Sequence, residues 1–181
     1  MEYKNNKVVT GRVRFSYANV WEPRSINGGD EKYGVSIIIP KSDKETIKKI
    51  NAAVEAAKKE GVSKFGGKVP ANLKLPLRDG DSDRPDDEAY ANSFFVNANS
   101  TTKPGIVDKN VQPILDTTEF YSGCYGRASL VFYAFNNNGN RGIACGLQNL
   151  QKLSDGEPLG SRSRAEDDFD SVDDEEDGFL D

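Results

Sequence analysis

Arginine side chains and aromatic rings share one face of a predicted strand in this sequence. In residues 125–135, Y-G-R-A-S-L-V-F-Y-A-F, the two-residue period of a β-strand places Arg127 and Tyr133 on the same side. The opposite side is suited to a core and carries Ala128, Leu130, Phe132 and Ala134. Bases stack on exposed rings while nearby cations meet phosphates, so the first face suits unpaired nucleotides. The alternative is a strand that is buried on both faces.

Residues of the same two kinds occur upstream. Residues 7–17 read as a strand in which Arg12 and Arg14 share a face, either as phosphate contacts or as solvated charges. Residues 18–32 read as a Gly-rich loop that carries Trp21, the single tryptophan of the chain. A loop tryptophan flanked by cations is a candidate for stacking, and the alternative is a ring that plugs one end of a barrel.

Histidine is absent from the chain, and this excludes several kinds of chemistry. Without it, Ser-His-Asp, Cys-His and histidine-based acid–base catalysis are not available. The two cysteines, Cys124 and Cys145, lie 21 positions apart and form no C-x-x-C motif, which argues against a zinc site. We therefore expect free, partly buried thiols, no cofactor and no enzymatic activity.

The elements that would position these side chains are mostly strands. A polar turn at residues 136–140, N-N-N-G-N, predicts a hairpin with strands 125–135 and 141–153. Two further strands are expected at 33–40 and 93–99, and a short edge strand could lie within the loop 103–115. With residues 7–17 these strands predict a mainly β fold, a five-stranded OB-fold-like barrel with one capping α-helix and long loops.

The capping helix is expected at residues 42–60. Ser42 is the expected N-cap, Glu45 completes a capping box, and Gly61 ends the helix. An apolar stripe along one face predicts that the helix lies over a core.

A long irregular segment, residues 62–92, holds the run D-G-D-S-D-R-P-D-D-E. Its first carboxylates resemble the start of a calcium loop, but the glycine is at position two rather than six, and position twelve is Tyr90 rather than Glu. A metal-dependent nuclease would be the enzymatic alternative. Its candidate ligands are Asp79, Asp81, Asp83 and Asp116.

Charge divides the chain into two parts. Residues 166–181 hold ten of the 29 acidic residues and no Lys or Arg, so residues 1–165 hold 19 acidic residues against 24 basic ones, a net charge of +5. We expect a domain at 1–153, a flexible Gly/Ser/Arg linker at 154–165 and a disordered acidic tail at 166–181. No apolar run approaches the roughly 20 residues of a membrane span, and the N-terminus does not resemble a signal peptide, so we expect a cytoplasmic protein.

Several segments resemble the single-stranded-DNA-binding proteins of tailed bacteriophages, an OB-fold family with acidic C-terminal tails. They are residues 11–21 (G-R-V-R-F-S-Y-A-N-V-W), 39–43 (I-P-K-S-D), 77–81 (L-R-D-G-D), 121–135 and 142–147 (G-I-A-C-G-L). The resemblance implies a protein that coats and protects single-stranded DNA during phage replication or recombination, in the host cytoplasm.

The resemblance also implies a role for the tail, which would recruit a polymerase, helicase or nuclease and compete with DNA for the groove. That role would fall on Asp173, Asp174, Glu175, Glu176, Asp177 and Phe179. In several such proteins the aromatic residue is the last of the chain, whereas Leu180 and Asp181 follow it here.

On this interpretation, cations neutralise phosphates and rings stack on bases. The candidate DNA-binding residues are Arg12, Arg14, Tyr17, Trp21, Arg24, Lys32, Phe95, Tyr125, Arg127 and Tyr133. The alternatives are a protein-interaction module whose acidic tail mimics nucleic acid, and a strand-annealing protein.

Overall fold

A computed structural model of the chain describes residues 6–25, 29–159 and 169–172. The expected tail residues from Asp173 to Phe179 lie outside the described residues, as do residues 160–168. No helix in the described part of the chain has the length and apolar character needed to cross a membrane.

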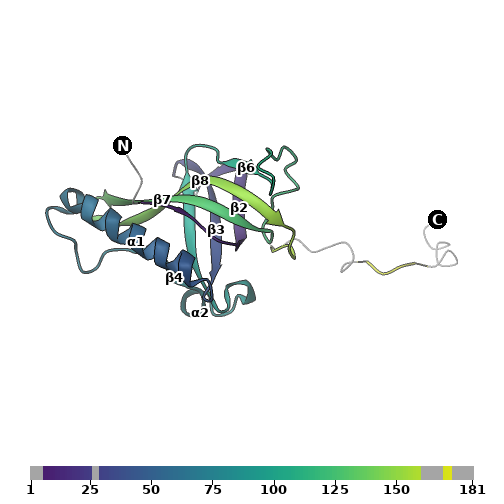
Figure 1. Ribbon diagram of the computed structural model, residues 1–181, viewed down its shortest axis with the longest axis horizontal. Helices are drawn as coiled ribbons and strands as arrows, with labels where there is room; N and C mark the ends of the chain where they lie inside the picture. The colour runs from purple at the N-terminus through teal and green to yellow at the C-terminus, as the bar shows by residue number, and fades with distance from the viewer. Residues whose placement is uncertain (1–5, 26–28, 160–168, 173–181) are drawn as a thin grey trace.

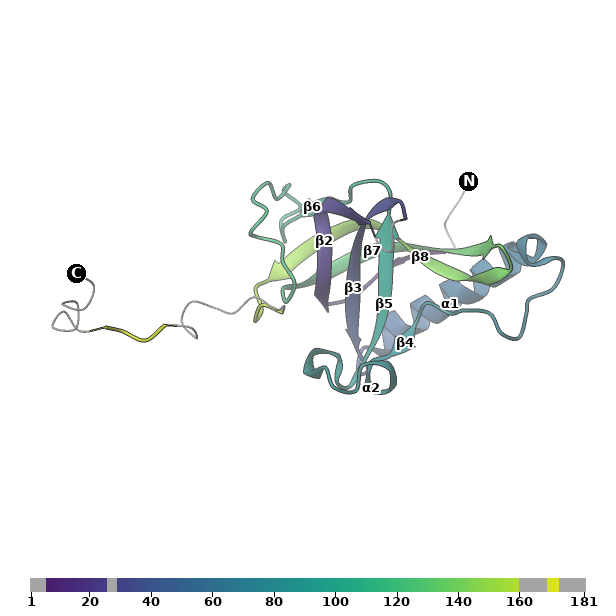
Figure 2. The ribbon, with the colours of Figure 1, turned by 180° about the vertical axis from the view of Figure 1, so that it is seen from behind.

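Five strands form a closed ring, which we call the strand ring. Its members, in order around the ring, are β2 (Val13–Ser25), β3 (Glu31–Pro40), β5 (Ser93–Ser100), β8 (Asn140–Ser154) and β7 (Tyr125–Asn137), and β7 pairs again with β2. All these pairings are antiparallel except that of β5 with β8. Figure 2 shows β2, β3 and β5 side by side across one face, with the β7–β8 hairpin behind them. The expected mainly β, OB-fold-like arrangement of five strands is confirmed.

Three short strands extend the sheet. They are β1 (Lys7–Val9) beside β7, β4 (Arg78–Asp79) beside β5, and β6 (Gly105–Val107) beside β8. The expected edge strand within the 103–115 loop is therefore present as β6.

The core fills the inside of the strand ring. Alternate residues of each strand point inward, so Ile37 and Ile39 of β3 meet Leu130 and Phe132 of β7 in one buried cluster. The predicted inward set of β7, which is Ala128, Leu130, Phe132 and Ala134, is buried throughout.

The helix α1 (Lys44–Glu60) lies along the hairpin and packs on β7 and β1 (Figure 1). Its N-cap is Asp43 rather than the expected Ser42, because the Asp43 carboxylate accepts hydrogen bonds from the backbone N–H and the hydroxyl of Thr46. Gly61 ends the helix as predicted, with its N–H donated to the Ala57 carbonyl at 2.9 Å.

The hairpin turn follows the sequence prediction closely. Asn138 and Gly139 both have positive φ, 52° and 86°, which is the backbone that a two-residue type I′ turn requires. β7 begins at Tyr125 as predicted and ends at Asn137, two residues later than predicted, and β8 extends one residue beyond the predicted bounds at each end.

Two sequence predictions about the N-terminal half were wrong. Residues 7–17 form two strands, β1 and β2, that are separated at residues 10–12. The predicted loop 18–32 is largely strand, because β2 keeps pairing with β3 up to the pair Ser25–Glu31 across two register shifts. Trp21 therefore lies on a strand, not on a loop.

The irregular segment 62–92 contains short elements of its own. These are the 3₁₀ helices η1 (Val62–Phe65) and η2 (Glu88–Tyr90), the strand β4 and the short helix α2 (Gly80–Asp83). β4, α2 and η2 lie against β5 and shape the surface described next, whereas η1 packs on β7 and α1.

The first residues of the expected linker rest on the strand ring. The N–H of Leu159 donates to the Ser122 carbonyl at 2.8 Å, and the N–H of Gly156 donates to the hydroxyl of Tyr121 at 3.1 Å. The chain therefore leaves the ring beside the turn that precedes β7.

Candidate nucleic-acid interface

The outer side of β2, β3 and β5 is hollowed into a shallow trough. Its cations are Arg24 from β2 and Arg84 from the end of α2, and its exposed ring is Tyr17. Asn97 and Asn99 of β5 supply amide groups between them.

Tyr17 points into this trough because of a local irregularity in β2. Its φ is +48°, a left-handed conformation that costs a non-glycine residue roughly 1–2 kcal/mol. The pairing with β3 shifts register between Ser16 and Asn19, as in a β-bulge, and bulges redirect side chains. The side chain is 56% exposed, and the guanidinium of Arg84 lies 5.4 Å from its ring centroid.

Arg84 lies over aromatic rings at the end of the trough next to α2. Its guanidinium is 5.3 Å from the centroid of Tyr90 and 5.6 Å from that of Phe95. Arg84 was not among the candidates, because its position depends on how the 80–92 segment folds across β5.

Phe95 was expected to stack on a base, and this prediction was wrong. Residues 80–92 cover its side chain, which is only 1% exposed. Tyr90 covers it edge-on with the ring centroids 5.0 Å apart, and the Tyr90 hydroxyl donates to Ser36 at 2.8 Å. The ring of Phe95 is therefore not available to a base, and we leave Phe95 out of the interface.

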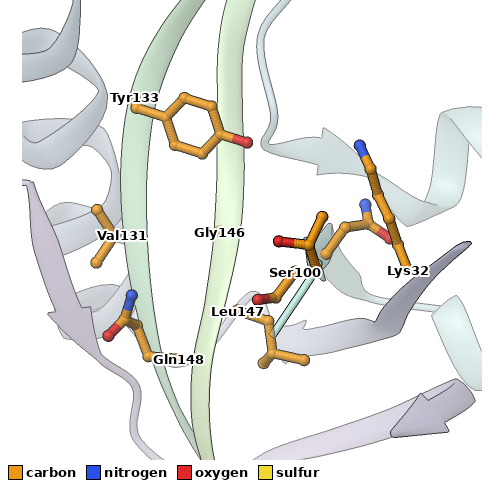
Figure 3. A pocket seen from close by; sticks show the side chains of 9 residues that line it. Lys32, Ser100, Val131, Tyr133, Gly146, Leu147 and Gln148 are labelled. Carbon is orange, nitrogen blue, oxygen red and sulfur yellow. The ribbon is translucent and has the colours of Figure 1, made fainter. Parts of the chain in front are cut away.

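A second hollow adjoins the first, with Asn99 lining both. Lys32, Ser100 and Tyr133 line its sides (Figure 3). Together the two hollows form one continuous surface, which we name the outer groove.

Tyr133 is the exposed ring of the second hollow, with 43% of its side chain accessible. Its ring lies over Gly146 of β8, and a Cβ built on that glycine would lie in van der Waals contact, 3.4 Å from Cε1 of the tyrosine. Burial of the rest of the residue raises the pKa of the Tyr133 hydroxyl, so this group stays protonated as a hydrogen-bond donor near neutral pH.

The outer groove carries charge of one sign. Three cations line it, Arg24, Lys32 and Arg84, and no Asp or Glu is present among the described residues that line its two hollows. Four of the ten sequence candidates come together here, namely Tyr17, Arg24, Lys32 and Tyr133.

Three other candidates gather in a separate cluster. The guanidinium groups of Arg12 and Arg14 lie 4.9 and 5.3 Å from the ring centroid of Tyr125. Arg14 donates to the carbonyls of Gly123 and Glu157, at 3.1 and 2.6 Å. In this structure the C-terminal segment therefore lies against Arg14.

The remaining two candidates lie outside the outer groove. Arg127 is exposed, and its Nε donates to the Thr10 carbonyl at 2.9 Å. Trp21 is half-buried against the core and donates from its indole nitrogen to the Phe120 carbonyl at 3.1 Å.

None of the carboxylates considered for a nuclease lines the outer groove. Asp79 and Asp81 both form ion pairs with Lys41, at 2.9 and 2.8 Å. These hydrogen bonds raise the pKa of Lys41 and lower the pKa of the two aspartates. Asp116 instead accepts hydrogen bonds from the hydroxyl and the N–H of Thr118.

The chain matches one protein-family model, described as Enterobacter phage Enc34, ssDNA-binding protein, over residues 6–180. A curated relative, "Putative protein p50" of Acyrthosiphon pisum secondary endosymbiont phage 1, is 31% identical over 159 residues, covering 83% of this chain and 85% of its own.

Two of the similar solved structures come from different phages. The single-stranded DNA-binding protein from bacteriophage Enc34 in complex with ssDNA is 26% identical with a TM-score of 0.76, over 88% of this chain and 96% of that chain. The single-stranded DNA-binding protein gp2.5 of bacteriophage T7 is 13% identical with a TM-score of 0.62, over 87% and 97% of the two chains, and shares the fold. The chain therefore belongs to the family of the Enterobacter phage Enc34 ssDNA-binding protein.

Proposed function

We propose that this protein binds single-stranded DNA in the outer groove, without catalysis and with little sequence preference. One observation carries the proposal: the exposed rings of Tyr17 and Tyr133 lie beside three cations, with no carboxylate among the described groove-lining residues. The family match supports it, because the Enc34 protein with the same fold was solved in complex with ssDNA.

The low sequence preference follows from the kind of contact. Each base has a π face, so a stacked base contributes on the order of 1–3 kcal/mol whatever its identity. The cations contact phosphates, which are the same at every nucleotide. Asn97 and Asn99 add amide groups that can hydrogen-bond to sugars or bases of any sequence.

The acidic tail completes the proposal. It recruits replication or recombination proteins and competes with DNA for the positive surface. The support for this part is the charge pattern, ten acids in residues 166–181 against a body of net charge +5, together with the family resemblance. The protein would coat single strands that replication or recombination exposes.

Charge removal in the groove tests the DNA-binding proposal. In the double variant Arg24→Gln/Lys32→Gln, the slope of log affinity for oligo-dT against log salt should fall by about 0.7 for each phosphate contact that is lost. Fluorescence anisotropy of a labelled oligo-dT at several salt concentrations measures this slope. Lys48→Gln on the exposed side of α1 is the matched control and should leave the slope unchanged.

Equal slopes for the double variant and the wild type would count against the groove as the binding surface. Absence of oligo-dT binding by both the full chain and a chain without residues 166–181 would favour the protein-interaction alternative. Cleavage of the oligonucleotide in Mg²⁺ or Mn²⁺ would favour the nuclease.

A further inference from the structure

The outer half of the β7–β8 hairpin extends past the strand ring (Figures 1 and 2). The last pair that joins β8 to β5 at this end is Ala98 with Cys145. Beyond it, β7 and β8 continue together to the pair Asn137–Asn140. This projecting ribbon starts at Tyr133, which is already part of the outer groove.

Two aromatic rings lie in register with small residues on one face of this ribbon. Tyr133 is paired with Ala144 and Phe135 with Gly142. A Cβ built on Gly142 would lie 2.9 Å from Cε1 of Phe135, so this ring covers a glycine just as Tyr133 covers Gly146. We name this surface, formed by Tyr133, Phe135, Gly142, Ala144 and Gly146, the hairpin face.

A lysine borders the hairpin face. The Lys74 N–H donates to the Arg141 carbonyl at 3.1 Å, and its carbonyl accepts from the N–H of Ile143 at 2.9 Å, so residue 74 runs beside β8. The same Cβ on Gly142 would lie 2.8 Å from Cβ of Lys74. The side chain of Lys74 therefore starts on the side where Phe135 lies, and it is exposed.

The segments that form and border this ribbon carry cations and no carboxylate. Residues 61–77 and 125–153 contain no Asp or Glu. Residues 61–77 contain Lys64, Lys68 and Lys74, and Arg141 is paired with Asn136 beside the hairpin turn. A polyanion that leaves the outer groove at Tyr133 meets cations and a second ring in the direction of the hairpin turn.

We propose that single-stranded DNA continues from the outer groove onto the hairpin face, where Phe135 stacks with a base and Lys74 contacts a phosphate. The inference rests on the proposed function and adds a second segment to its binding site. Continuity with the outer groove and the absence of Asp and Glu from residues 61–77 and 125–153 favour a DNA strand over a second copy of the chain as the occupant.

Two lengths of labelled oligo-dT test this inference. Lengths of about 6 and about 15 nucleotides fall near the two ends of the range that one OB fold covers, roughly 4–16 nucleotides. Phe135→Leu should weaken binding of the longer oligonucleotide about fivefold, the lower end of the loss expected for one stack, and leave the shorter one within about twofold. Lys74→Gln should reduce the salt slope by about 0.7 for the longer oligonucleotide only, with Lys48→Gln as its matched control.

The outcomes separate this inference from the proposed function. If the wild type binds both oligonucleotides and neither variant shows a loss specific to the longer one, the extension is wrong while the groove stands. If the wild type binds neither, the proposed function fails first. If Phe135→Leu does not fold, the exposed Lys74→Gln variant still tests the inference. A change in self-association of the variants without DNA, with oligonucleotide affinity unchanged, would assign the hairpin face to a second copy of the chain instead.

Discussion

At the scale of single residues, exposure of a ring depends on what else folds over it. Tyr17 was a stacking candidate and is exposed, although strand alternation placed it on the side of Val13 and Phe15. Strand alternation predicted Tyr133 as an exposed candidate, and it is exposed. It also predicted Phe95, which points to the outer side of β5 but lies under Tyr90. Periodicity assigns a side chain to a face, and it contains no information on whether a distant loop covers that face.

The two thiols give a residue-scale prediction. Burial raises the pKa of Cys124 and of Cys145, and both thiols are free and buried. A raised pKa in the folded state means that the stabilising contribution is complete below the unfolded thiol pKa of about 8.5 and declines as the pH rises above it. Native protein should therefore resist iodoacetamide at about pH 8.5, while protein in denaturing urea is alkylated, and the urea midpoint should decrease towards about pH 10.

Mass spectrometry after timed alkylation reports the first effect, and urea titrations across the same pH range report the second. Alkylation of the native protein at the rate of the unfolded chain would contradict the buried placement of both cysteines.

At the scale of elements, periodicity and turn chemistry predicted the parts that local sequence controls. The Asn-Gly turn and the period-two strands around it identified the hairpin, and the apolar stripe identified α1. The predicted loop at 18–32 was wrong because Gly, Pro and Asn there indicate a break, whereas β2 accommodates such residues through bulges while it stays paired with β3. Arg84 was missed because the 80–92 segment gives no periodic signal.

The start of α1 gives an element-scale prediction. Asp43 accepts from the N–H of Thr46, and the Thr46 hydroxyl accepts from the N–H of Gly11, so this cap also ties the helix to the segment before β2. Asp43→Ala should lower the free energy of unfolding by about 0.5–2 kcal/mol. Ser42→Ala is the matched control and should stay within about 0.5 kcal/mol, because the exposed Ser42 is not the cap.

Urea denaturation at neutral pH measures both variants. Equal decreases in the free energy of unfolding for the two variants, or a decrease only for Ser42→Ala, would contradict Asp43 as the N-cap. The N-cap would then be Ser42, as the sequence predicted.

At the scale of the whole molecule, the charges of body and tail have opposite sign. The C-terminal segment leaves the strand ring beside Arg14, and residues 166–181 could extend up to about 50 Å at full stretch. If the tail competes with DNA, deletion of residues 166–181 should tighten oligo-dT binding, most clearly at low salt where screening is weak. Anisotropy titrations at low and high salt would show this, and weaker or unchanged binding after the deletion would argue against competition.

Photo-cross-linking tests the central claim most directly, because it reports which side chains touch a base. Oligo-dT that carries 5-iodouracil, irradiated in complex with the full chain and digested for mass spectrometry, should cross-link to Tyr17 and Tyr133 in the outer groove. Cross-links confined to α1 or to the Arg12–Tyr125 cluster, with neither groove tyrosine modified, would contradict it.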